Sequence, residues 1–216
     1  MHAEPTTHAQ GTNSGPKVVR ANQFILEDEF GKVRAELTTS KDGPRLVMYD
    51  KTGKPCAILS GAEGGSALAL FDDKTGKTRA LLVTDNDGPA LDLLNENGDV
   101  ARAVLTTRKD GTGLYLFDEA NKPHAILTTY KDGPRLTLFD ETNKPRAVLT
   151  TDKDGPRLAL VDENEKTRAE LTTSQNVPRL AMRDEHERTR AVVAVTPDGP
   201  ILGFADKDGK TIFSQP

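Results

Sequence analysis

The chain has no tryptophan, few aromatic residues and one cysteine, and each of these shortages excludes a class of protein. Aromatic residues make up 5% of the 216 residues and hydrophobic residues 35%, so one compact core of ordinary aromatic content is not expected. The single thiol, Cys56, excludes an intrachain disulfide framework. The composition instead favours an elongated molecule with a thin core, because each slice of such a molecule needs few apolar side chains.

Long apolar runs and an excess of basic charge are also missing. No stretch approaches the roughly 18 consecutive apolar residues of a membrane-spanning helix. The 29 basic and 33 acidic residues are interspersed and give a net charge of −4, so a nucleic-acid-binding surface is not predicted. Residues 1–16 lack the apolar segment of a signal peptide. The sequence therefore leaves the compartment open: cytoplasmic, or secreted or at the cell surface if a signal was removed.

Repetition is the dominant feature of the sequence. One turn residue, nearly always aspartate, recurs at intervals of 22 or 23 residues. The nine copies are Asp28, Asp50, Asp72, Asn95, Asp118, Asp140, Asp162, Asp184 and Asp206. This periodicity predicts a single domain of nine units over residues 18–216. Residues 1–17 are poor in apolar residues and are predicted to form a disordered tail.

Each unit contains two short alternating segments joined by turn sequences. Leu136 and Leu138 alternate with Thr137, and residues 146–149 repeat the pattern, which is typical of half-buried strands. The linkers Asp-x-x-Gly/Asn-Lys and Lys-Asp-Gly-Pro supply turn residues, including ones that tolerate positive φ. The sequence therefore predicts two strands in every unit.

The apolar positions of a unit predict how its strands pair. Counted from the turn aspartate as zero, these positions are −4, −2, +7 and +9. If zero pairs with +5 in an antiparallel hairpin, all four side chains lie on one side. We expect that side to form the core.

Two all-β architectures satisfy this pattern. One is an elongated meander of hairpins, curled so that its apolar side is covered. The other is a β-solenoid, in which the apolar positions of two facing sheets would meet about 10 Å apart. Burial favours the solenoid. Charge favours the meander, because a solenoid would stack equivalent aspartates and arginines about 4.8 Å apart.

The units resemble the tandem Asp-x-x-Gly-Lys-x-Arg-Ala-x-Leu repeats of uncharacterised bacterial proteins. The likeness covers residues 18–213, and Asp140-Glu-Thr-Asn-Lys-Pro-Arg-Ala-Val-Leu149 is one of its clear copies. The resemblance implies a bacterial surface-associated or scaffolding protein and carries no information about an activity.

The sequence predicts no enzyme, because catalysis needs one unique constellation of unlike residues, whereas each position of this repeat recurs in every unit. Cys56 and His124 replace the usual arginine of their column and could in principle form a thiol–imidazole pair, but drift at exposed positions explains them better. His186 stands in a turn without further metal ligands nearby in sequence. No catalytic residue, metal site or cofactor is predicted, and a small-molecule ligand is not expected.

Two repetitive features remain as candidate interaction sites. One is a contact stripe at position −1, made of Tyr49, Phe71, Phe117 and Phe139. The other is a threonine face made of Thr38, Thr106, Thr128, Thr150 and Thr172, beside a column of aliphatic residues. The predicted function is a structural scaffold or interaction protein that binds a protein partner or copies of itself. The alternative is a module that binds glycan or ice on the flat threonine face.

Overall fold

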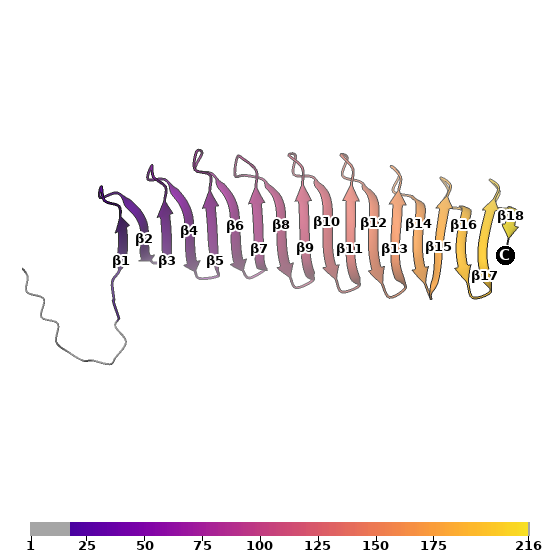
Figure 1. Ribbon diagram of the computed structural model, residues 1–216, viewed down its shortest axis with the longest axis horizontal. Coiled ribbons are helices and arrows are strands. Elements are labelled where there is room, and N and C mark those ends of the chain that lie inside the picture. Colours follow the sequence, from indigo (N-terminus) through magenta and orange to yellow (C-terminus); the bar gives the residue numbers. More distant parts are fainter. Residues whose placement is uncertain (1–17, 216) are drawn as a thin grey trace, which may run out of the picture.

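Eighteen antiparallel strands form one continuous sheet in the computed structural model, which describes residues 18–215 (Figure 1). The strands are β1 (Gln23–Glu27), β2 (Val33–Ser40), β3 (Gly43–Tyr49), β4 (Pro55–Ala62), β5 (Gly65–Phe71), β6 (Thr78–Asp85), β7 (Gly88–Leu94), β8 (Ala101–Arg108), β9 (Gly111–Phe117), β10 (Pro123–Tyr130), β11 (Gly133–Phe139), β12 (Pro145–Asp152), β13 (Gly155–Val161), β14 (Thr167–Ser174), β15 (Val177–Arg183), β16 (Thr189–Thr196), β17 (Gly199–Ala205) and β18 (Thr211–Gln215).

Every strand pairs with the next strand along the chain, from β1 with β2 to β17 with β18. This confirms the predicted all-β hairpin repeat and selects the meander. A solenoid would instead pair strands one whole unit apart. The predicted disordered tail, residues 1–17, lies outside the described residues and stays a prediction.

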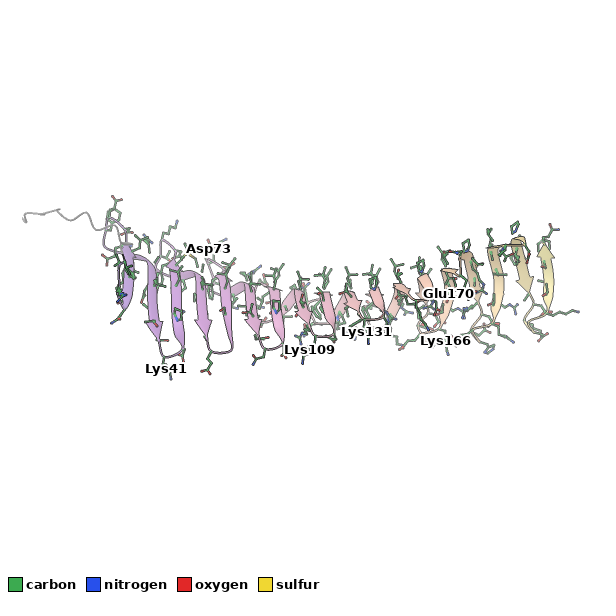
Figure 2. The ribbon with its side chains drawn as sticks, turned by 90° about the horizontal axis from the view of Figure 1, so that it is seen from below. Lys41, Asp73, Lys109, Lys131, Lys166 and Glu170 are labelled. Atoms are coloured by element: carbon green, nitrogen blue, oxygen red, sulfur yellow. The ribbon has the colours of Figure 1, made fainter. Side chains whose placement is uncertain are left out.

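The sheet is a single layer. Figure 1 shows all strands in one row, and Figure 2 shows side chains projecting from both sides of the ribbon with no second layer over either. We had expected a meander to curl so that its apolar side is covered. The sheet does not do so, and within residues 18–215 its apolar side has no second layer over it.

The apolar register of the hairpins is the predicted one. Leu138 lies opposite Ala147 and Leu136 opposite Leu149, so positions −4, −2, +7 and +9 share one side. The pairing next to the turn was predicted wrongly by one residue. Position zero was expected to pair with +5, but the Asp140 amide donates to the carbonyl of Lys144, at position +4, at 3.0 Å. A β-bulge between positions −2 and −1 absorbs the difference.

The turns along the upper edge in Figure 1 each begin at the repeated turn residue, which is aspartate in all units but one. In the hairpin of β11 and β12 the amide of Asn143 donates to the Asp140 carbonyl at 2.9 Å, and Asn143 has φ 63°. This is a turn of three residues whose last residue is left-handed, which explains why glycine or asparagine is common there. In the two 23-residue units the extra residue lies in this turn. The amides of Asp72 and Asn95 donate to the carbonyls of Lys77 and Val100, five residues later, whereas the Asp140 amide donates to a carbonyl four residues later.

The turns along the opposite edge need their glycine for a different reason. In the Lys-Asp-Gly sequence before β11 the two loop residues are Lys131 and Asp132, and Gly133 already pairs with Tyr130. Gly133 has φ 119°, and a Cβ atom there would lie 1.8 Å from the carbonyl oxygen of Thr151 on β12. The glycine therefore allows two backbones to approach closely at the start of the strand.

Candidate interaction surfaces

One side of the sheet carries an unbroken row of large apolar side chains, which we call the leucine row. Successive members lie directly opposite one another on neighbouring strands from β1 to β17. The row consists of Phe24, Leu37, Leu46, Leu59, Leu68, Leu82, Leu91, Leu105, Leu114, Leu127, Leu136, Leu149, Leu158, Leu171, Leu180, Val193 and Leu202.

A second row on the same side alternates large and small residues, and we call it the alternating row. Each odd-numbered strand to β17 contributes leucine, methionine or phenylalanine and each even-numbered strand to β16 contributes alanine, while β18 ends the row with phenylalanine. Its members are Leu26, Ala35, Met48, Ala57, Leu70, Ala80, Leu93, Ala103, Leu116, Ala125, Leu138, Ala147, Leu160, Ala169, Met182, Ala191, Phe204 and Phe213.

These two rows, with a flanking row of mostly threonine and proline such as Thr151 opposite Pro156, form the apolar face. No side chain of the three rows carries a charge in the described strands. Because side chains alternate along a strand, every charged residue within a strand projects to the other side, which we call the charged face. The repeat thus separates apolar from charged side chains across the sheet.

The apolar face is exposed, whereas we had expected it to be the core. Leu138 is 44% exposed and Leu149 is 48% exposed, although both occupy predicted core positions. Thr137 and Val148, which point to the charged face, are 8% and 6% exposed. The side chains were assigned to the correct sides, but the better-covered side was predicted wrongly. Long charged and aromatic side chains can cover their small neighbours, whereas leucines in a single layer cannot cover one another.

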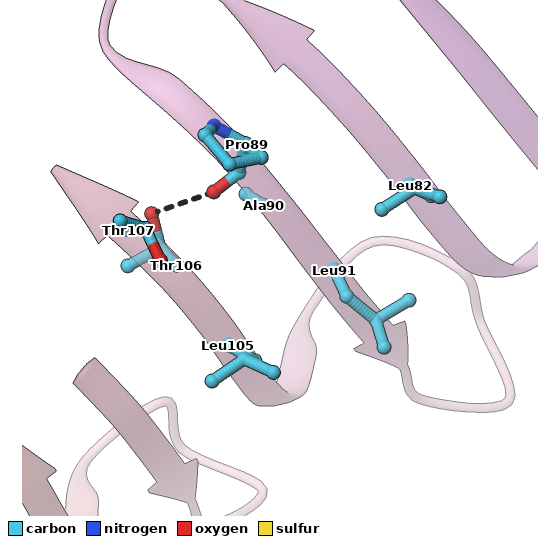
Figure 3. Close-up of a pocket in the computed structure, with 7 residues that line it drawn as sticks. All are labelled: Leu82, Pro89, Ala90, Leu91, Leu105, Thr106 and Thr107. Atoms are coloured by element: carbon cyan, nitrogen blue, oxygen red, sulfur yellow. Dashed lines mark hydrogen bonds between the residues drawn. The ribbon is translucent and has the colours of Figure 1, made fainter. Parts of the chain in front are cut away.

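The apolar face is not smooth. A shallow hollow lies among Leu82, Leu91 and Leu105 of the leucine row, on β6 to β8, with Pro89 and Thr107 beside it (Figure 3). The hydroxyl of Thr106 on β8 donates to the carbonyl of Pro89 on β7 at 3.3 Å, which joins these two strands next to the hollow. A side chain from another apolar surface could enter such a hollow.

The charged face contains ion pairs that lie against the sheet. Glu170 on β14 is 8% exposed and accepts from Arg157 at 2.9 Å and from Arg183 at 3.2 Å. Near the other end, the hydroxyl of Tyr49 donates to Glu36 at 3.2 Å, and burial raises the pKa of Tyr49. These contacts pair some of the polar groups of the charged face with partners from the same chain, whereas Nη1 of Arg168 and Nε of Arg183 are buried without a hydrogen-bond partner among the described residues.

The predicted contact stripe lies on the charged face. Its four residues end strands β3, β5, β9 and β11, and all four are half-buried. Leu94 occupies the equivalent place on β7, so the stripe runs along alternate strands. Phe117 stacks on Tyr115, with 6.4 Å between ring centroids. The structure thus places the stripe residues in one row, two strands apart or more.

The predicted threonine face also lies on the charged side. Thr106 is 6% exposed and Thr128 is 3% exposed. Arg135 lies opposite both Thr128 and Thr150 on the two neighbouring strands, so a long charged side chain stands between consecutive threonines. Thr38, Thr150 and Thr172 are half-buried. The five threonines share a row, but they do not form an uninterrupted flat array.

The residues that break the repeat do not come together. Cys56 lies on β4 and His124 on β10, six strands apart, or about 29 Å at the usual strand spacing. The Cys56 thiol contacts the Met48 carbonyl at 3.4 Å, and His124 lies 3.6 Å from Asp118. His186 is exposed and contacts its neighbour Glu185. Within residues 18–215 no three histidine, cysteine, aspartate or glutamate side chains are grouped so that they could hold a metal ion.

Sequence reasoning missed the apolar face as a surface, although its signal is present in the sequence. Positions −4 and +9 are leucine in nearly every unit, and charged residues within strands fall on the opposite parity. Uniform apolar residues on one side and charges confined to the other are typical of a sheet that contacts something on its apolar side.

No family model matches the chain, and no curated protein matches it. Solved structures do match, among them "Crystal Structure of TcdB2-TccC3-TEV", at 12% sequence identity and a TM-score of 0.20. That match covers 89% of this chain but only 14% of the other, so this chain spans a small part of the protein it matches. A likeness at this TM-score carries no argument about function. No helix within the described residues is long and apolar enough to span a membrane.

Proposed function

We propose that the chain is a non-enzymatic scaffold or interaction protein that presents a repetitive β surface to protein partners, and that the apolar face is this surface. The observation that carries the proposal is the exposure of the leucine row along nearly the whole sheet. Monomeric soluble proteins rarely expose apolar patches larger than a few hundred Å², and larger ones mark interaction sites.

The distribution of charge supports the same proposal. Ion pairs such as that of Glu170 with Arg157 join charged side chains of the charged face within the chain. The apolar face offers an uncharged, regularly spaced surface on a continuous ladder of paired strands. Such a surface suits contact with another protein and offers few groups for acid–base or nucleophilic chemistry.

The proposal predicts that the apolar face is covered in the cell. Leu127→Cys in a Cys56→Ser background places one thiol on that face, and Lys131→Cys places a matched thiol in the adjacent exposed hairpin loop. In extract of the natural host, a maleimide should label the loop cysteine at once and the Leu127→Cys cysteine only after urea is added. Equal labelling of both thiols without urea would mean that the apolar face has no partner.

A further inference from the structure

The proposed function leaves the occupant of the apolar face unnamed, and three properties of that face point to one. More than twenty large side chains of the leucine and alternating rows are exposed, with exposed fractions from 36% for Leu91 to 63% for Leu26. A half-exposed leucine carries on the order of 50 Å² of apolar surface. The face therefore offers about 1,000 Å² per copy, more than the roughly 800 Å² per partner of a standard stable interface.

The shape of the face repeats at the interval of one hairpin. In the alternating row Leu138 and Leu160 project on either side of Ala147, so ridges and gaps follow each other along the sheet. Two strands separate successive ridges, or about 9.6 Å. A surface that fills these gaps needs large side chains at the same interval over a similar length, and large residues that alternate with small ones interdigitate when two layers meet.

A second copy of the chain has these properties. It carries the same alternating row at the same interval, an uncharged face of equal length and a sheet twist of the same hand. We propose that two copies pack apolar face to apolar face as a two-layer homodimer, with the sheets about 10 Å apart. The inference rests on the proposed function, because it names the partner of the same surface.

Other occupants fit the face less well. Residues 1–17 could span at most about 60 Å even when fully extended, whereas eighteen strands at about 4.8 Å need more than 80 Å. That segment also has few apolar residues. A lipid surface attracts faces rimmed by basic residues, but acidic turn residues accompany the lysines along both long edges, as Asp132 accompanies Lys131.

Sedimentation equilibrium of the full-length protein tests the inference. At about 10 µM it should give twice the mass of the chain. Leu138→Glu should weaken the dimer at least about 100-fold, because two carboxylates would be buried in each interface. Leu138 is half-exposed in the single chain, so this variant should keep the circular dichroism of the sheet. Arg135→Glu introduces the same side chain on the other face of the same strand and should leave the dimer intact.

A monomeric wild-type protein at 100 µM, a mass that rises without limit through open-ended association, or equal effects of Leu138→Glu and Arg135→Glu would each overturn the inference. The wild-type mass decides even if a variant fails to fold. Co-sedimentation of a wild-type monomer with vesicles of phosphatidylcholine and phosphatidylglycerol would show a lipid occupant and would also overturn it. A monomer whose apolar face is nonetheless protected from maleimide in host extract would contradict only the homodimer and leave the proposed function standing.

Discussion

The turn aspartate shows how one side chain fixes a hairpin of this repeat. One carboxylate oxygen of Asp140 accepts from the amides of Thr142 and Lys144 at 2.9 and 3.0 Å, and the other accepts from Arg146 at 2.7 Å. The Lys144 amide, followed by the Thr142 hydroxyl, holds the pKa of Asp140 well below its ordinary value of 3.8. The same amide, four residues after the aspartate, is the largest cause of the lowered pKa of Asp28, Asp118 and Asp162.

We predict that Asp140→Asn lowers the midpoint of thermal unfolding by about 2–4 °C, because asparagine keeps an acceptor for the turn amides but loses the ion pair with Arg146. Glu141→Ala is the control, since no side-chain hydrogen bond or ion pair of Glu141 is found in this turn. Differential scanning calorimetry at neutral pH measures both. Equal midpoints for wild type and Asp140→Asn would mean that the carboxylate does not stabilise the turn.

The difference in stability between wild type and Asp140→Asn should depend on pH, and the lowered pKa of Asp140 fixes the direction. A carboxyl with a lowered pKa in the folded state contributes stability that is present above pH 3.8 and is lost as the pH falls through the folded value. The difference between wild type and Asp140→Asn should therefore stay constant from pH 7 to about pH 4 and shrink below it. A difference that grows as the pH falls would contradict this assignment.

At the scale of the hairpin, backbone approach decides which substitutions the turns tolerate. Gly133→Ala should lower the free energy of unfolding by about 2 kcal/mol or more, because its Cβ would meet the Thr151 carbonyl and its φ is positive. Gly53→Asn should cost little, since Gly53 has open space around it and asparagine holds the same turn position at Asn143. Urea unfolding followed by circular dichroism compares the two. Comparable losses would show that the close contact does not constrain the strand.

The hairpin is also the scale at which the sequence predicts most. The opposition of Leu138 to Ala147 follows from period-two alternation and from the position of the turn. The bulge at Arg146 does not follow, because it depends on how the left-handed turn residue returns the chain to the ladder. The turn before β15 makes the same point. Gln175 and Asn176 both have positive φ there, so Val177 replaces the glycine that other units need.

At the scale of the whole molecule, the sequence shows which side chains share a side but not what covers them. Alternation places Leu149 with Leu138 and Thr137 with Val148 in either architecture. Which side is covered depends on whether a second layer exists and on how far the arginines reach across the other side. Both are properties of the assembled sheet, so the exposure of the leucine row could not be predicted from one unit.

Because each unit adds two strands to a single ladder, removing one unit should shorten the molecule without changing its faces. Deletion of residues 119–140 joins Asp118 to Glu141 and restores an intact Asp-Glu-Thr-Asn-Lys turn between β9 and β12. We expect a folded protein whose largest dimension in small-angle X-ray scattering is smaller by about 10 Å, two strand spacings. Deletion of residues 119–129 is the control, since it removes one strand and would force β11 to pair with β9 in the wrong direction. That variant should lose part of its sheet signal in circular dichroism. If instead both deletions fold equally well, the two-strand hairpin is not the unit from which this sheet is built, and the alternation of large and small residues on its apolar face would have to arise from another constraint.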